Sequence, residues 1–405
     1  MCAMTSRERV MRSLNFESVD RVPKDLGGMA STSISAFAYP KLVTALGLPQ
    51  RRCRVHDTSS MLAMPDMDVL DALGCDVVII WDCVTNAFDD SNKWQDYDFN
   101  GRLSARVCDR SIFIDHPDGT ITQPQRSSIM PPTSTVFDLA HGGNPLDLSA
   151  ELPKPNLKQV KADLDKYFPA DEYIKKLSLH CKNVRNSTDK AIFLNGPISL
   201  SISICLPGGL AVWPMICMTE PGFVQDYHGI VTEGTVKLIE AILPEIANNV
   251  DIIMLAADDW GTQQNLIASP AIFENLYLPY YKRVNDCIHQ ITPEVKTFLH
   301  SCGAIYDIID LIIKSGFDVL NPVQWSAGEQ GYMKWKDKCR NRIALWGGGV
   351  NSQVTLPLGS IKEVVNESKK VVDYLKQDSG YVFNSIHNIT AEIDPEKVIA
   401  MYNAV

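Results

Sequence analysis

The chain has neither an excess of positive charge nor a paired-cysteine pattern, and each absence excludes classes of protein. Its 405 residues carry a formal net charge of −10. Such an acidic chain is a poor partner for nucleic acid or for an anionic membrane surface. The 11 cysteines are scattered without a Cys-x-x-Cys pair, unlike a disulfide framework or a zinc ribbon. Because Met1–Thr5 also lacks the apolar stretch of a secretory signal, we expect a cytoplasmic protein.

An uninterrupted membrane span is also missing. The segment from Gly196 to Thr219 holds no charged residue and is long enough to cross a bilayer. However, Pro197, Pro207 and Pro214 interrupt it, so a lipid-exposed backbone would be left with unsatisfied polar groups. We interpret the segment as a buried loop and helix near a substrate pocket and expect no membrane partner.

The chain does contain a series of short β-branched apolar runs, each ending in, or followed closely by, Gly, Asp or Asn. They cover residues 21–26, 76–80, 191–195, 251–256, 295–300, 317–321, 342–346 and 380–385. The last five alternate with helix-like stretches at 270–292, 304–315, 330–339 and 360–377. This alternation predicts parallel β/α units, and eight runs match a (β/α)8 TIM barrel of the α/β class. We expect one barrel domain over residues 1–405.

One long stretch, residues 83–190, breaks the alternation and is predicted to be inserted between the second and third strands. Within it, Asp115-His116-Pro117-Asp118-Gly119 is typical of a hairpin turn. A long insertion in an enzyme often forms a lid or one wall of a binding site. A solvent-exposed insertion without a role in binding is an equally good interpretation.

Polar side chains collect where the predicted strands end, which is where barrels carry their chemistry. Polar groups are costly to bury unless they meet water, one another or a ligand. We therefore expect a site there, with Asn195, Asp259, Asn321 and Gln324 as substrate-binding residues. The full set is Asp82, Asn195, Asp258, Asp259, His300, Cys302, Asn321, Gln324, Asn351, His387 and Asn388.

The sequence His300-Ser301-Cys302-Gly303 carries the sharpest signal. Residues i and i+2 of an extended segment face the same side, so an imidazole and a thiol can point at one spot, as zinc ligands must. His387 is the candidate third ligand. The alternatives are a packed histidine and a buried thiol, and a His387 that is hydrogen-bonded without metal.

Asp258 and Asp259 also have two interpretations. One carboxylate could bind a substrate group or orient a ligating histidine, and we favour Asp258 for this catalytic role. The alternative is a helix cap or an Asx turn leading into Trp260. The triple glycine Gly347-Gly348-Gly349 lacks phosphate-loop spacing, and we expect it to allow close approach of the backbone to a bulky ligand.

The chain resembles the uroporphyrinogen decarboxylase superfamily over nearly its whole length. The resemblance implies a (β/α)8 barrel with its site at the C-terminal mouth. It also implies one of two activities: cofactor-free decarboxylation of a tetrapyrrole, or methyl exchange with a corrinoid, commonly on zinc held by a His-x-Cys pair and a later residue. The matching pieces are Thr5-Ser6-Arg7-Glu8-Arg9-Val10, Asp20-Arg21-Val22-Pro23, Asp258-Asp259-Trp260-Gly261-Thr262-Gln263, His300-Ser301-Cys302-Gly303, Asn321-Pro322-Val323-Gln324, Trp346-Gly347-Gly348-Gly349, His387-Asn388-Ile389 and Pro395-Glu396.

Departures from each branch favour methyl transfer. The decarboxylases carry an Arg-Gln-Ala-Gly-Arg-Tyr element after the first strand, whereas this chain has Lys24-Asp25-Leu26-Gly27-Gly28-Met29 and no arginine. The His-x-Cys pair is typical of the methyltransferase branch. Methyltransferases of this family often have a further cysteine near the end of the last strand, but this chain has His387 there instead. The decarboxylases also have a histidine at that position. We expect zinc on His300, Cys302 and His387, a corrinoid carried by a partner protein, and a small methylated substrate or methyl acceptor. A decarboxylase and a non-catalytic binding protein on the same barrel are the alternatives.

Overall fold

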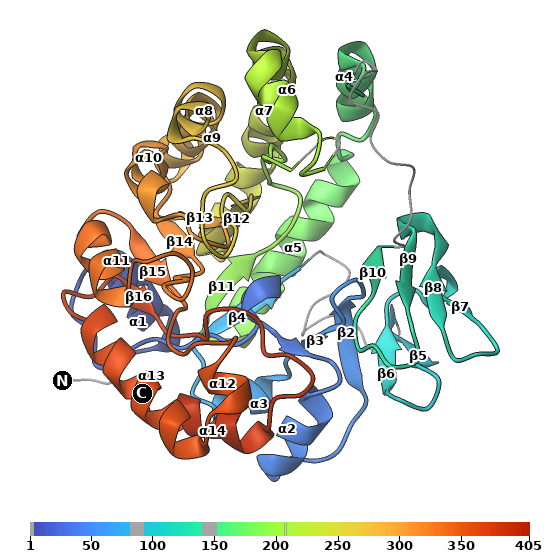
Figure 1. The fold of residues 1–405 in the computed structure, drawn as a ribbon, viewed down its shortest axis with the longest axis vertical. Coiled ribbons are helices and arrows are strands. Elements are labelled where there is room, and N and C mark those ends of the chain that lie inside the picture. Colours follow the sequence, from blue (N-terminus) through green and yellow to red (C-terminus); the bar gives the residue numbers. More distant parts are fainter. Residues whose placement is uncertain (1–3, 82–92, 140–151, 206, 208) are drawn as a thin grey trace.

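A curled parallel sheet of seven strands forms the centre of the protein in the computed structural model, which describes residues 4–81, 93–139, 152–205, 207 and 209–405 (Figure 1). The sheet order is β16-β15-β14-β13-β12-β11-β4, so each strand lies beside its neighbour in the sequence. Seven of the eight predicted runs supply these strands. They are β4 (Val77–Ile80), β11 (Ala191–Leu194), β12 (Ile252–Ala257), β13 (Lys296–His300), β14 (Val319–Asn321), β15 (Ala344–Trp346) and β16 (Tyr381–Val382).

The predicted first strand over 21–26 is wrong as a regular strand. Lys24 forms only an isolated parallel bridge with Phe383, next to β16. On the other side, the Asp76 N–H donates to the Lys24 carbonyl over 2.7 Å, just before β4. Pro23 has no N–H to donate, which limits the ladder that this segment can form. The segment therefore links the two edges of the curled sheet by three backbone hydrogen bonds, two with Phe383 and one with Asp76.

Helices surround the sheet and mostly follow the predicted alternation (Figure 1). The predicted helix over 270–292 is two helices, because Pro279 falls in the first turn of the second and removes a backbone donor. The helices are α1 (Ser6–Leu14), α2 (Tyr39–Ala45), α3 (Met67–Ala72), α4 (Leu157–Lys166), α5 (Asp171–Ser187), α6 (Trp213–Thr219), α7 (Pro221–Ile246), α8 (Pro270–Leu276), α9 (Leu278–Ile291), α10 (Ile309–Lys314), α11 (Tyr332–Cys339), α12 (Thr355–Leu358), α13 (Ile361–Leu375) and α14 (Pro395–Asn403). None of the helices in the described ranges is long and apolar enough to cross a membrane.

Two smaller sheets lie to one side of the curled sheet (Figure 1). One has the order β1-β3-β2-β6-β5 and the other β10-β9-β8-β7. The hairpin predicted around Asp115–Gly119 is confirmed, since β7 and β8 pair antiparallel and the His116 N–H donates to the Thr120 carbonyl over 2.9 Å. The strands are β1 (Ile34–Ser35), β2 (Cys53–Asp57), β3 (Leu62–Met64), β5 (Gln95–Asp98), β6 (Ser104–Val107), β7 (Ile114–Asp115), β8 (Ile121–Gln123), β9 (Ser128–Met130) and β10 (Asp138–Leu139).

These sheets bear on the predicted insertion over residues 83–190. The five-stranded sheet pairs β2, which precedes β4 in the chain, with β6, which follows it. The helix α5 leads directly into β11 and continues the β/α alternation. The chain between β4 and β11 therefore shares a sheet with an earlier segment, and the boundaries 83–190 of a separate insertion stay a prediction.

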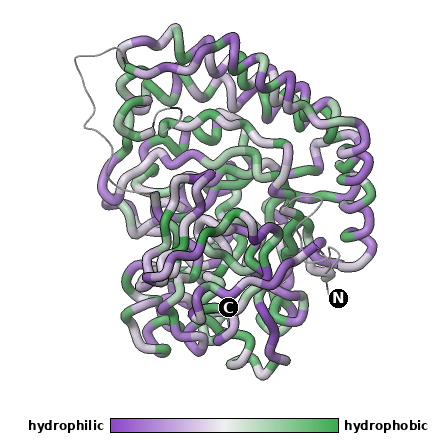
Figure 2. Tube along the Cα trace, turned by 90° about the vertical axis from the view of Figure 1, so that its right-hand side faces the viewer, coloured by the Kyte–Doolittle hydropathy of each residue, from purple (hydrophilic) through white to green (hydrophobic). Residues whose placement is uncertain are grey.

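The concave face of the curled sheet is filled by its own side chains. Phe193, Phe298 and Trp346 meet edge to face, with ring centroids 4.9–5.9 Å apart, and all three are fully buried. Figure 2 shows green hydrophobic stretches running through the interior of the trace. Because these packed side chains fill the interior of the curled sheet, we expect a functional cavity at the ends of the strands.

Candidate metal and substrate site

His300 is the last residue of β13, and the strand register sets its surroundings. It pairs with Asn321 at the end of β14, and its Nδ1 lies 2.7 Å from the Asn321 Oδ1. The Asn321 Nδ2 donates to the Trp346 carbonyl over 2.9 Å, so Oδ1 must be the atom that faces His300. An amide oxygen only accepts, and His300 Nδ1 therefore carries the proton. The lone pair is left on Nε2, the nitrogen that faces Cys302.

Ser31 is a site residue that the sequence reasoning missed. Its hydroxyl lies 2.9 Å from His300 Nδ1 and 3.2 Å from Asn321 Oδ1. It belongs to a short 3-10 helix, Ala30–Thr32, that follows the segment linking the sheet edges. Ser31 is 269 residues from His300 in the chain, and no spacing or motif pointed to it.

The Cys302 thiol lies next to both a histidine and a carboxylate. Its Sγ is 3.2 Å from His300 Nε2, and its backbone N–H donates to Asp259 Oδ1 over 2.8 Å. The same Asp259 oxygen is 3.6 Å from His300 Nε2. Burial, then the negative charge and hydrogen bond of Asp259, raise the pKa of the Cys302 thiol far above its usual value. A nearby cation would reverse this balance and favour the thiolate.

Two glycines allow this arrangement. The Gly261 N–H donates to the Cys302 carbonyl over 3.0 Å, which brings the turn after β12 against the turn after β13. A Cβ on Gly303 would overlap the Gly261 carbonyl, and Gly303 has a φ of +89°. Only glycine tolerates both the contact and the left-handed backbone. The Gly261–Gly303 contact thus holds Asp259 beside Cys302.

His387 approaches from the loop after β16. Its ring centroid is 5.9 Å from that of His300, and its backbone N–H donates to the Ser352 hydroxyl over 3.0 Å. Burial and the neighbouring His300 lower the pKa of His387, which favours the neutral imidazole that a metal needs.

His300, Cys302 and His387 fit a zinc site by ligand type and spacing. One ligand atom from each lies within 4.8 Å of the others. Ligands around a tetrahedral zinc are about 3.5 Å apart, so small side-chain movements would complete three of four positions. The fourth position would be open to a substrate atom.

In the described part of the chain, the Asp258 carboxylate makes no hydrogen bond to these three side chains. It is fully buried, and its carboxylate accepts from the Ile204 N–H at 2.8 Å, the Trp260 indole at 2.5 Å and the Tyr281 hydroxyl at 3.0 Å. Burial raises its pKa to about 6. Asp258 thus anchors the loop after β11 to the end of β12.

Of the other predicted residues, Gln324 supports the turn of Cys302 and Asn195 lines a cavity. Gln324 accepts a hydrogen bond from the Gly303 N–H over 2.7 Å and so braces the turn that carries Cys302. Asn195 lines a cavity beside His300, whereas Asp82 lies outside the described residues.

The triple glycine packs against the chain around β16, and its predicted approach to a bulky ligand stays a prediction. The Gly347, Gly348 and Gly349 N–H groups donate to the carbonyls of Val382, Ser385 and Asn384. A Cβ on Gly349 would overlap the Phe383 ring. These glycines allow the loop after β15 to pack against the chain around β16.

The cavity beside His300 has a volume of about 380 Å³ and opens at the C-terminal ends of β4, β11, β12 and β13. His300, Asn195 and four serines contribute its polar surface, while Trp81, Met29 and Met254 contribute apolar surface. This size is within the usual range for a small-molecule site. The cavity therefore offers space for a small molecule beside His300 and Ser31.

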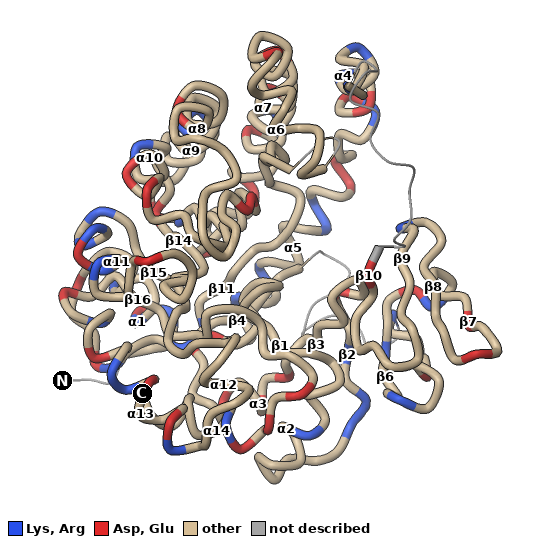
Figure 3. The backbone as a smooth tube through the Cα atoms, in the orientation of Figure 1, with Lys and Arg blue, Asp and Glu red and all other residues tan. Residues whose placement is uncertain are grey.

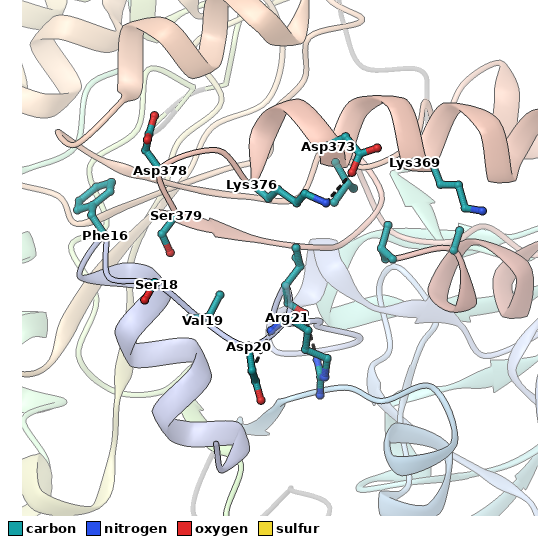
Figure 4. Close-up of a pocket in the computed structure, with 14 residues that line it drawn as sticks. Phe16, Ser18, Val19, Asp20, Arg21, Lys369, Asp373, Lys376, Asp378 and Ser379 are labelled. Carbon is teal, nitrogen blue, oxygen red and sulfur yellow. Dashed lines mark hydrogen bonds and ion pairs between the residues drawn. The ribbon is translucent and has the colours of Figure 1, made fainter. Parts of the chain in front are cut away.

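A larger cavity, of about 710 Å³, lies at the opposite ends of the strands (Figure 4). Three ion pairs involve residues of its lining: Lys376 with Asp373, Arg21 with Asp76, and Asp20 with Arg9. These pairs, together with its distance along the strands from His300, favour a structural role.

Comparisons with known proteins agree with this architecture. The family described as uroporphyrinogen decarboxylase (URO-D) matches residues 143–405. A chloroplastic uroporphyrinogen decarboxylase 2 from Oryza sativa subsp. japonica is 23% identical over 292 residues, covering 70% of this chain and 68% of the relative. The uroporphyrinogen decarboxylase of Geotalea daltonii is 22% identical over 306 residues, covering 75% and 84%.

Among solved structures, a methyltransferase from Methanosarcina mazei has a TM-score of 0.55 and 16% sequence identity. It covers 99% of this chain and 98% of its own. The curled parallel sheet with polar residues at its C-terminal ends defines an α/β, TIM-barrel-like enzyme fold. The chain belongs to the uroporphyrinogen decarboxylase family.

Proposed function

We propose that this protein is a methyltransferase that moves a methyl group between a small substrate and the cobalt of a corrinoid held by a partner protein, on a (β/α)8 barrel. The observation that carries the proposal is the convergence of His300, Cys302 and His387, whose ligand atoms lie within 4.8 Å of one another. Decarboxylation has no evident use for such a donor set, whereas activation of a methylated heteroatom does.

The element after the first predicted strand also favours this branch. Lys24 is its one cation, and its ammonium donates to the Tyr402 carbonyl over 2.6 Å instead of facing the cavity. Asp25 is buried and accepts from the Gly28 N–H and the Trp346 indole, at 2.8 and 2.9 Å. The element therefore gives no grip for a substrate with many carboxylates.

Each site residue has a task in the proposed reaction. When bound, zinc would supply positive charge beside the heteroatom that bears or receives the methyl group. Asn321 and Ser31 keep the His300 lone pair on Nε2, toward that position. In the demethylating direction, the methyl–heteroatom bond breaks and its electron pair stays on the heteroatom, which then takes a proton. The electron pair for the new cobalt–carbon bond would come from the partner's corrinoid in its cobalt(I) state.

The loop after β11 would shield this exchange from water. Asp258 fixes the loop through the Ile204 N–H, and Tyr277 donates to the Ser203 carbonyl over 3.3 Å. Excluding water protects a reduced cobalt centre and strengthens the electrostatic effect of nearby charges. We assign Asp258 to holding this wall, and Asn195 and Asp259 to substrate contact.

Decarboxylation is the second candidate, because the curated relatives bear that name and His387 occupies a position where decarboxylases resemble this chain. The test uses protein prepared without chelator and has three readouts. We expect about one zinc per chain, methyl exchange with a methylated corrinoid protein, and no stepwise loss of carboxyl groups from uroporphyrinogen. Decarboxylated products would overturn the choice of reaction. A chain without metal and without either activity would favour a non-catalytic binding protein.

A further inference from the structure

The cavity beside His300 has an unusual composition for a family whose named members act on a polycarboxylate. None of the residues that the structure shows lining it is Lys, Arg, Asp or Glu. Its polar groups are the hydroxyls of Ser31, Ser199, Ser201 and Ser203, the Asn195 side chain and the His300 ring. These groups make hydrogen bonds without supplying a permanent charge.

Two carboxylates lie close to this lining. Asp258 lies behind Ser203 and Ile204, and Asp259 stands beside His300 and Cys302. Figure 3 shows Lys and Arg mainly on the outer helices and the lateral sheets. Arg54, on β2, is bonded to Asp66 at 2.6 Å.

The segments outside the described ranges, residues 1–3, 82–92, 140–151, 206 and 208, contain no Lys and no Arg in their sequence.

From this lining we infer that the site takes a small, uncharged methyl-bearing substrate, an ether, thioether or similar compound without a carboxylate, phosphate or sulfonate. This inference rests on the proposed methyltransferase function and specifies its substrate class. When the methylated heteroatom faces the zinc, an anionic group elsewhere in this cavity meets no cationic side chain, and its burial should weaken binding on the order of a hundredfold or more. Apolar surface from Trp81, Met29 and Met254 would instead favour the body of a neutral molecule, with serine hydroxyls orienting its heteroatom.

The test compares matched neutral and anionic probes on the full-length, zinc-loaded protein, by ligand-observed NMR and calorimetry at pH 7. Anisole is paired with 4-methoxybenzoate, and dimethyl sulfide with 3-(methylthio)propionate. We expect the neutral member of each pair to bind at least about tenfold more tightly. Equal or tighter binding of either carboxylate, or no binding of any probe, would overturn the inference.

A designed cation sharpens the test. Ala257 lines the cavity from the end of β12, and its surface is exposed. Ala257→Lys should raise affinity for both carboxylates at least about tenfold, while Ala257→Gln, of similar length and without charge, should leave the neutral preference in place. If Ala257→Lys folds but leaves carboxylate binding unchanged, charge does not set the specificity.

Failure of this inference and failure of the proposed function give different results. A protein that holds one zinc and exchanges methyl groups but prefers the carboxylates would lose only the inferred substrate class. A protein that binds neutral probes without holding zinc or exchanging methyl groups would keep the cavity specificity and lose the methyltransferase function.

Discussion

The two sides of the His300–Cys302–His387 cluster are held in different ways. His300 ends a five-residue strand within the sheet, and both Asn321 and Ser31 bind its Nδ1. Cys302 sits on a turn fixed by the Gly261–Gly303 contact. His387 instead lies in the loop after a two-residue strand, where its backbone N–H donates to Ser352 and its Nδ1 is hydrogen-bonded to the neighbouring Asn388 side chain. We therefore expect the first side to contribute more to the affinity for a metal than the second.

Breaking the Gly261–Gly303 contact should have the largest effect. Gly303→Ala places a Cβ against the Gly261 carbonyl in a left-handed conformation. We expect a loss of roughly 3–5 kcal/mol in the free energy of unfolding, together with loss of metal. Thermal and denaturant unfolding measure the first, and elemental analysis the second. Gly229→Ala, in α7 with open space around it, should be neutral or slightly stabilising. A Gly303→Ala protein as stable as the parent would show that the two turns can separate freely.

Removing the thiol should abolish tight metal binding without unfolding the chain. Cys302→Ser replaces a soft ligand by a weak one, and we expect zinc affinity to fall by more than about a hundredfold. Competition with a chromogenic chelator gives the affinity. The control is Cys339→Ser, in α11, which should keep the metal and lose some stability, because Cys339 is buried away from the strand ends. Equal metal loss in both variants would argue against a site at Cys302.

Asn321 tests the fixed orientation of His300. Asn321→Leu removes the acceptor for the Nδ1 proton and should weaken zinc binding about 10- to 100-fold. Asn321→Asp keeps an acceptor and should restore much of that affinity, although it loses the donor to the Trp346 carbonyl. If the Leu and Asp variants bind zinc alike, Asn321 acts only in packing.

The less firmly held side should give the smallest loss. His387→Ala should lower methyl exchange strongly but zinc affinity only about tenfold, because two better-supported ligands remain. Full metal with little turnover would assign His387 to the substrate instead. His116→Ala on the β7–β8 hairpin serves as the matched control and should change neither property. A folded His387→Ala protein with full metal and full activity would remove His387 from the site.

The sequence predicted the parallel sheet well because each strand is a local, β-branched run followed by a turn residue. It failed at 21–26, where pairing is limited to a few hydrogen bonds with Phe383 and Asp76, which are distant in the sequence. The pair His300 and Cys302 was found because both lie within one short motif.

Roles that depend on register were beyond the sequence. Strand pairing sets Asn321 directly beside His300, a contact that no motif predicted, while its predicted binding of substrate stays a prediction. Asp258 was expected at the reaction centre, and its carboxylate is fully engaged by Ile204, Trp260 and Tyr281. Ser31 could not be found at all, because only the curvature of the sheet brings it to His300.

At the proposed metal site, the placement of Asp259 beside the Cys302 thiol would make metal uptake a proton-releasing reaction. With its pKa raised, Cys302 is protonated at neutral pH, and coordination requires the thiolate. Each bound divalent ion should therefore expel about one proton, and the apparent affinity should rise about tenfold per pH unit. Calorimetry in two buffers of different ionisation enthalpy counts that proton directly. Occupancy of the site would then follow the acidity of the surroundings as well as the supply of metal.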